Sequence, residues 1–277
     1  MRITLLANRD VHANRVVDRL VRRLCGHDLS LVLSQRVGRA AALPADLREL
    51  RLHEQLLLDE LLAPLLMTAQ RPDSAVRTFD ELGAQLDGRM RTVDRPRSAE
   101  GRAALLAHAP ELMISIRYGG ILDAEHARAA PYGILNLHSG RLPDYRGILA
   151  GLQALLAGDT RLYCTLHRIE DAGIDTGPII ASAGIDHDPD RSLLWNLMRL
   201  YTPGIELIVD AVARIAAGEA LPGTVQDPDA GAYYGLPDDD QLQRFRDRGL
   251  RLTDLGDTLE LMRCLYLDGD PLLPDQP

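Results

Sequence analysis

The chain has 277 residues, of which 46% are hydrophobic and 26% charged, a composition typical of a globular protein with a substantial core. A net charge of −9 argues against a large nucleic-acid-binding surface, and no apolar run is long enough to predict a membrane span or a signal peptide. All 31 basic residues are arginines, which excludes a lysine Schiff base and the lysine of a phosphate-binding P-loop.

The three cysteines, Cys25, Cys164 and Cys264, are widely spaced and form no CxxC motif. Their odd number and spacing favour reduced, mostly buried thiols in a cytoplasmic protein over a disulfide framework. We expect no metal site.

The first 34 residues predict the strand, helix, strand opening of a parallel α/β fold. Residues 2–7 form an apolar strand, residues 13–25 carry apolar side chains at helical spacing, and residues 29–34 form a second strand. No GxGxxG motif follows the first strand, so we expect no dinucleotide site here. His12 lies where ligands of α/β sheets gather, but a lone histidine is more often a packed residue.

Residues 44–67 are rich in leucine and predict a helix that Pro64 ends or kinks. His53 lies on this helix, and we interpret it as a surface or packed residue. Residues 68–100 are polar and interrupted by prolines and glycines, which indicates surface loops and short elements.

Residues 98–108 predict a helix, and residues 112–116 a buried strand that ends in the sequence RYGGIL. Gly119 and Gly120 in this sequence indicate a tight turn with positive φ. A short helix over residues 123–129 should follow.

The stretch GILNLHSGRLPDYRG at residues 133–147 begins as a buried strand and ends in a loop punctuated by glycine and proline. Because side chains alternate along a strand, Asn136 and His138 should point to the same side, about 7 Å apart. Asp175 follows downstream between Gly173 and Gly177. An amide, an imidazole and a carboxylate suit the attack of an amine on a carbonyl group, because an oxyanion must be stabilised and a proton must leave the nucleophile.

Residues 148–157 predict a helix that Gly158 ends, and residues 163–169 a strand that places Thr165 and His167 on one side. His167 points toward the same end as Asp175, so it either supports the site or is a hydrogen-bonded strand residue, and the second role is more common.

Residues 179–185 predict a further strand, followed by a long amphipathic helix, or two half-helices, broken near Pro203. From Leu221 onward the chain is rich in proline and aspartate. Tyr233 and Tyr234 there could form an acceptor or dimer surface, or belong to a tail that packs back on the sheet.

Four segments between residues 111 and 181 resemble the folate-dependent formyltransferases in order and in spacing. They are SIRYGGIL, NLHSGRLPDYRG, ALLAGDT and CTLHRIEDAGIDTGPI. The resemblance implies a Rossmann-like, mostly parallel sheet flanked by helices. It also implies transfer of a formyl group from 10-formyltetrahydrofolate to an amine, with Asn136, His138 and Asp175 as catalytic residues. Implied contacts to the folate pterin are made by Tyr118, Gly119, Gly120, Ile121, Leu122, Asp171, Gly173 and Ile174.

The chain departs from this family at Gly140 and Arg141, where a serine and a leucine are usual, and the change alters the loop beside the acceptor. We expect a catalytic domain over residues 1–220 and a short extension over 221–277, too short for the barrel domain of methionyl-tRNA formyltransferases. A small-molecule amine is therefore the expected acceptor, such as an amino sugar nucleotide, an amino acid or a hydroxylamine, and a homodimer is an open option.

Three alternatives remain open. The same residues could direct water at the formyl group and release formate, although no regulatory domain precedes the first strand as it does in known deformylases. The acceptor could instead be methionyl-tRNA. A folate-binding protein without activity is the least favoured reading, because the three catalytic positions are intact.

Overall fold

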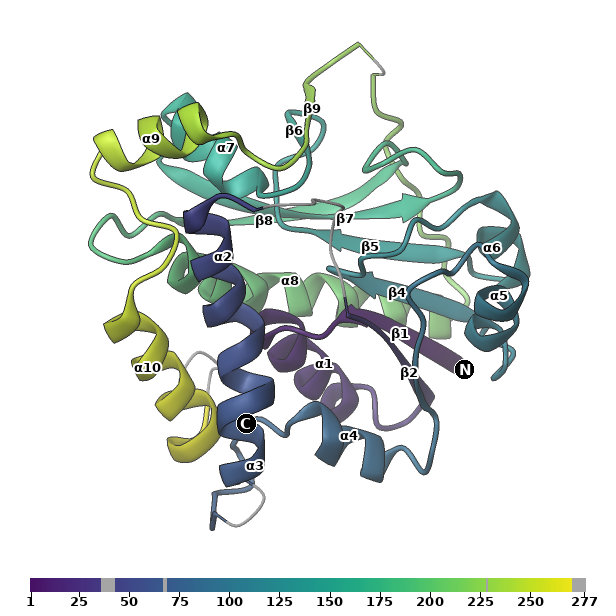
Figure 1. Cartoon of the computed structure of the whole chain (residues 1–277). Helices are drawn as coiled ribbons and strands as arrows, with labels where there is room; N and C mark the ends of the chain where they lie inside the picture. Colours follow the sequence, from purple (N-terminus) through teal and green to yellow (C-terminus); the bar gives the residue numbers. More distant parts are fainter. Residues whose placement is uncertain (36–42, 67–68, 228, 271–277) are drawn as a thin grey trace.

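The computed structural model describes residues 1–35, 43–66, 69–227 and 229–270. Its centre is a seven-stranded sheet in the order β3-β2-β1-β4-β5-β7-β8 (Figure 1). The strands are β1 (Arg2–Asn8), β2 (Asp28–Ser34), β3 (Met90–Thr92), β4 (Leu112–Ile116), β5 (Ile134–His138), β7 (Arg161–Ile169) and β8 (Ile179–Asp186). Pairing is parallel from β3 to β5 and antiparallel for β7 and β8. The predicted α/β class with a mostly parallel sheet is confirmed.

Helices cover both faces of the sheet. The helices α1 (Val11–Arg23) and α8 (Leu193–Ala216) pack into the main hydrophobic core, and α5 (Ala99–Leu105) and α6 (Ala124–Ala129) contribute to a second cluster on the opposite face. Asn136 and His138 share this second face with Ile134, because the side chains of β5 alternate.

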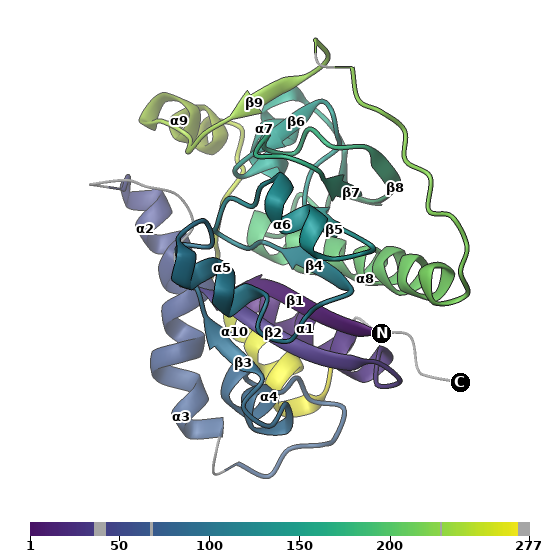
Figure 2. The ribbon, with the colours of Figure 1, turned by 90° about the vertical axis from the view of Figure 1, so that its right-hand side faces the viewer.

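The remaining elements lie around the sheet. They are α2 (Ala45–Arg51), the π-helix η1 (Leu52–Leu62), α3 (Ala63–Leu66), α4 (Phe79–Gln85), β6 (Tyr145–Gly147), α7 (Ala150–Ala157), β9 (Ala232–Tyr234), α9 (Asp239–Asp247), α10 (Leu255–Arg263) and η2 (Cys264–Asp268). The views in Figures 1 and 2 place β6, β9, α7 and α9 together at the end of the molecule near β8, and α3 and α4 at the other end. In the described ranges, no helix combines the length and the hydrophobicity needed to cross a membrane.

The structure decides one open alternative and corrects two expectations from the sequence. Of the two alternatives around Pro203, the structure has the single long helix. Cys25, expected to be buried, is exposed. Within the stretch predicted as surface loops and short elements, residues 90–92 form a short edge strand. The positive φ near RYGGIL is 56° at Arg117 and does not occur at Gly119 or Gly120.

Other predictions are confirmed with small shifts at the ends of elements. The helix expected over residues 44–67 is formed by α2, η1 and α3, and Met67 lies outside the described residues. The tail packs back on the rest of the chain: β9 pairs with β6 in a separate two-stranded sheet, and Phe245 is buried in the main core, whereas Tyr233 is exposed.

Candidate active site

Two adjacent strands bring polar side chains together on one face of the sheet. In the antiparallel register of β5 and β7, Asn136 lies opposite His167, and His138 lies opposite Thr165. Asp175, from the loop that joins β7 to β8, folds over this face and reaches both histidines. The structure therefore brings together the three residues predicted as catalytic and adds His167 to them.

The amide of Asn136 is held by two acceptors. Its Nδ2 lies 3.0 Å from Nε2 of His167 and 3.4 Å from Oδ1 of Asp175, and these two acceptor atoms are 3.3 Å apart. The acceptors thus subtend about 60° at Nδ2, whereas the two N–H bonds of a planar amide diverge by about 120°. One N–H can point between both acceptors, which leaves the other directed elsewhere. In that orientation the second N–H would be available to a ligand oxygen.

The tautomer of His167 follows from its neighbours. Its Nδ1 lies 2.8 Å from the carbonyl oxygen of Arg168, which can only accept, so Nδ1 carries the proton and donates. In the neutral ring Nε2 is then the acceptor for Asn136, whereas in the protonated ring Nε2–H faces Oδ1 of Asp175 at 3.3 Å. His167 is 1% exposed, so no water competes freely for these bonds.

Both ring nitrogens of His138 also have partners. Nε2 donates to the carbonyl oxygen of Tyr145 at 2.7 Å, and Nδ1 lies 3.4 Å from Oδ2 of Asp175. The imidazole is 7% exposed. A proton on Nδ1 would face the carboxylate directly, so the pair can store and exchange one proton beside Asn136.

Asp175 is the negative centre of this cluster. Burial raises its pKa, but the facing imidazoles of His138 and His167 and the N–H of Gly147, which donates to Oδ2 at 2.9 Å, outweigh burial and hold the pKa well below its usual range. Its backbone adopts a left-handed conformation with φ of 57°, which is unusual for a residue other than glycine. The carboxylate is therefore ionised at neutral pH and fixed by an unusual backbone turn.

Gly140, one of the two departures from the family pattern, lies against this cluster. A Cβ atom at this position would lie 2.4 Å from Cβ of Ala150 and 2.6 Å from Nε2 of His138. The observed position of the imidazole therefore depends on glycine at 140. The second departure, Arg141, ion-pairs with Asp144 at 2.5 Å and lies over the ring of Tyr163.

Arg117 anchors the start of the loop predicted to contact the pterin. Its guanidinium donates to Asp10 at 2.8 Å and to both oxygens of Glu54 at 3.0 Å. His12 is fully buried, with Nδ1 3.4 Å from Glu54, so it belongs to this ion-pair network. His53 is also buried and bonds to Thr258.

The residues predicted for cofactor contact lie on two loops beside the cluster. Leu122 is buried in the same apolar cluster as Ile134, and Tyr118 packs against that cluster and donates its hydroxyl to Val93. Ile121 and Ile174 expose 47% and 41% of their surface. The other four residues make backbone contacts or lie in turns. The N–H of Gly119 donates to Ser34, Gly120 packs near Pro96, and the N–H of Gly173 donates to the side chain of Asp171. Their contact with a pterin stays a prediction.

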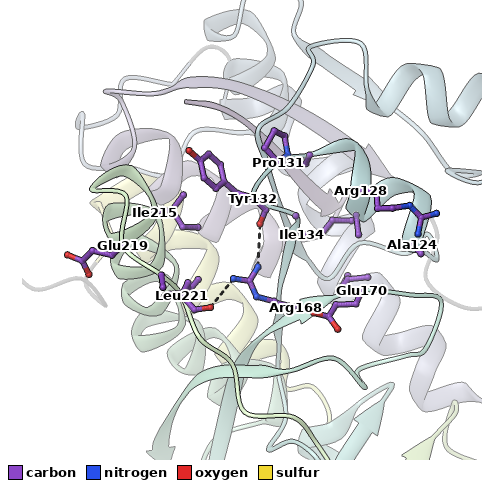
Figure 3. A pocket seen from close by; sticks show the side chains of 15 residues that line it. Ala124, Arg128, Pro131, Tyr132, Ile134, Arg168, Glu170, Ile215, Glu219 and Leu221 are labelled. Carbon is purple, nitrogen blue, oxygen red and sulfur yellow. Dashed lines mark hydrogen bonds between the residues drawn. The ribbon is translucent and has the colours of Figure 1, made fainter.

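A cavity of about 570 Å³ opens at the edge of the same region (Figure 3). Ile134 and Ile169, which pair across β5 and β7, line it, and the next pair on that face is Asn136 with His167. Arg168 spans the cavity wall, donating to the carbonyl oxygens of Tyr132 and Leu221. None of the eight predicted cofactor residues lines this cavity, although Ala124 and Glu170 adjoin the two loops.

Comparison with known proteins decides the family. Residues 66–212, just over half of the chain, match the model of the Formyl transferase family. The chain belongs to the formyl transferase family. Its curated relatives include the methionyl-tRNA formyltransferases of Verminephrobacter eiseniae, 38% identical over 136 residues, and of Thermus thermophilus, 36% identical over 112 residues. These matches cover 49% and 40% of this chain but only 41% and 36% of the relatives, so the match spans less than half the length of either relative.

Solved structures confirm the formyl transferase fold. A sugar N-formyltransferase from a Shewanella species superposes with a TM-score of 0.54 at 18% identity, covering 98% of this chain and 90% of that one. Phosphoribosylglycinamide formyltransferase from Anaplasma phagocytophilum has the same TM-score and identity, covering 86% of this chain and 99% of that one.

Sequence reasoning missed two contacts of the site. The amide of Gln226 donates to the backbone oxygens of Asp175 and Gly177, and the N–H of Gly147 donates to the Asp175 side chain. Gly147 stands in the DYRG sequence that carried the resemblance, so that motif was a usable signal. No pattern in the sequence singles out Gln226.

Proposed function

We propose that this protein transfers a formyl group from 10-formyltetrahydrofolate to the amine of a small molecule. The observation that carries the proposal is the arrangement of Asn136, His138 and Asp175 around one point on the sheet, with an ionised carboxylate behind the imidazole. Family membership supports the same reaction class.

The cavity beside Ile134 and Ile169 is lined by none of the predicted catalytic or folate-contact residues, so we place the folate on the two predicted loops instead. Folate bound by the loops at residues 118–122 and 171–174 would supply the activated formyl group. Asn136 would donate an N–H to the formyl oxygen, a contact that stabilises negative charge as the amine attacks. His138 and Asp175 would accept and relay the proton that the amine loses.

Charge near the site supports a small acceptor. Arg141, in the loop after His138, is paired with Asp144 and Asp159, and Arg161 at the start of β7 is paired with Asp186. A tRNA surface requires cations that can neutralise phosphates, and these arginines are already neutralised in a chain with net charge −9.

A methionyl-tRNA acceptor is the second candidate, and one observation favours it. The relatives of V. eiseniae and T. thermophilus are both methionyl-tRNA formyltransferases.

The test follows the release of tetrahydrofolate from 10-formyltetrahydrofolate with no acceptor, with a pool of amino sugar nucleotides and amino acids, and with methionyl-tRNA. We expect release that depends on the small amines and is strongly reduced, but still measurable, in Asp175→Asn. Release only with methionyl-tRNA would establish the second candidate, and release without any acceptor would identify a hydrolase. Absence of release under all three conditions would refute the proposed activity.

A further inference from the structure

The segment between α8 and β9 runs directly behind the candidate active site. Thr224 pairs with Ile179 at the start of β8, each backbone N–H donating to the other residue's carbonyl oxygen at 2.7 and 2.8 Å. Two residues later, Gln226 turns its side chain inward and is 8% exposed. It lies outside residues 66–212, the part of the chain that matches the family model.

The amide of Gln226 binds both sides of the turn that contains Asp175. Its Nε2 donates to the carbonyl oxygen of Asp175 at 3.0 Å and to that of Gly177 at 2.6 Å. Its Oε1 is buried and has no hydrogen-bond partner among the described residues. Because a buried acceptor without a partner is unfavourable, the stabilisation that this side chain provides comes from the two hydrogen bonds that its Nε2 donates.

These two bonds hold an otherwise disfavoured backbone conformation. Asp175 has φ of 57°, and left-handed residues other than glycine persist only where the surroundings fix them. The φ and ψ angles of Asp175 set the direction of its side chain, which must reach His138, His167 and Asn136 together.

The C-terminal part of the chain also contacts the loop of Gly147, the residue whose N–H donates to the Asp175 carboxylate. β9 pairs in parallel with β6, and the backbone of Tyr234 accepts from Ile148, next to Gly147. Gly147 in turn donates its N–H to Oδ2 of Asp175. Gln226 and β9 thus hold, respectively, the Asp175 turn that carries the acceptor and the chain next to the donor Gly147.

We propose that Gln226 is a positioning residue that aligns the Asp175 carboxylate with His138 and Asn136 through the Asp175 backbone. The proposal rests on the proposed formyl transfer for its catalytic consequence. Its structural consequence, a tightly held turn at residues 173–179, does not depend on any activity.

Three variants test the proposal. Gln226→Ala removes both donors, Gln226→Glu keeps the shape but presents a carboxylate to two carbonyl oxygens, and Gln243→Ala on the exposed part of α9 is the matched control. We expect both changes at 226 to lower kcat roughly ten- to a hundredfold, the effect of a small misplacement of catalytic groups, with KM values little changed. In an Asp175→Asn background, Gln226→Ala should change kcat by less than about twofold, because the two residues act as one unit.

Amide hydrogen exchange gives a readout that needs no substrate. Gln226→Ala should speed exchange at residues 173–179 and at Gly147, while Gln243→Ala leaves both unchanged. This measurement decides the positioning role even where the wild-type chain transfers no formyl group, so failure of the proposed function is distinguishable from failure of this inference. Wild-type kcat in an active Gln226→Ala protein, equal losses of kcat with and without Asp175, or unaltered exchange at these residues would each overturn the proposal.

Discussion

Replacing His167 with phenylalanine tests how the amide of Asn136 is held. The change keeps an aromatic ring but removes the Nδ1 donor to Arg168, at 2.8 Å, and the Nε2 acceptor for Asn136, at 3.0 Å. Asn136 keeps Asp175 as an acceptor, so the Arg168 carbonyl oxygen is the group that loses its donor, and we expect a loss of about 1–3 kcal/mol in the free energy of unfolding. Chemical denaturation at pH 7 measures this loss.

The same variant should also affect catalysis through Asn136. An oxyanion donor contributes roughly a hundredfold to a thousandfold to kcat, which sets the largest loss that misaligning Asn136 could cause. We expect a smaller loss of kcat, roughly tenfold, because Asp175 still accepts from the amide. In an Asn136→Ala background, His167→Phe should leave kcat nearly unchanged. Equal losses of kcat in both backgrounds would show that His167 does not act through Asn136 and would refute the geometry argued for the amide.

Three further substitutions probe the loops around the site. Gly140→Ser restores the usual family residue, but its Cβ would meet Ala150 and His138. We therefore expect a loss of about 1–3 kcal/mol in unfolding free energy and a lower kcat. Unchanged values would contradict the packing argument. Arg141→Leu removes a half-exposed ion pair and should change stability by less than about 1 kcal/mol, which denaturation can check. Glu54→Gln should destabilise by roughly 3 kcal/mol at pH 7, because the positive charge of Arg117 loses a buried partner.

The effect of Glu54 should depend on pH in a defined direction. Burial raises the pKa of Glu54, but Arg117 and His12 outweigh burial and lower the pKa from 4.5 to about 2. A carboxylate with a depressed pKa stabilises the fold fully above its unfolded pKa and loses this contribution as the pH falls through its folded pKa. The difference in unfolding free energy between wild type and Glu54→Gln should therefore shrink between pH 4.5 and pH 2. A difference that stays constant over this range would refute the ion-pair assignment.

Local periodicity was enough to predict the strands that carry the site. Alternation within residues 134–138 and 163–169 placed Asn136, His138 and His167 on the sides of their strands that the structure joins. The pairing of these two strands could not be read from alternation, because register depends on contacts between residues distant in the chain. The contact of Asp175 with both histidines is likewise a product of the loop between β7 and β8.

The features that sequence reasoning missed are those fixed by tertiary contacts. Positive φ at Arg117 is stabilised by buried ion pairs with Asp10 and Glu54, which lie 107 and 63 residues away in the chain. The glycines that follow it looked like the better candidates for that conformation, because glycine adopts it without a steric cost. The buried ion pairs of Arg117, which no local pattern reveals, outweighed the preference of glycine for positive φ.

The contacts behind the site also bear on how the chain is divided. A boundary at residue 220 stays a proposal, but several bonds cross it: Gln226 binds the Asp175 turn, β9 pairs with β6, and Arg248 donates to the carbonyl oxygens at the end of α7. Phe245 is buried in the same hydrophobic core as the sheet. The part of the chain after residue 220 holds the left-handed Asp175 in place and contributes to the main core. We therefore expect it to unfold together with the sheet, since removing it would expose apolar surface and release the Asp175 turn at once.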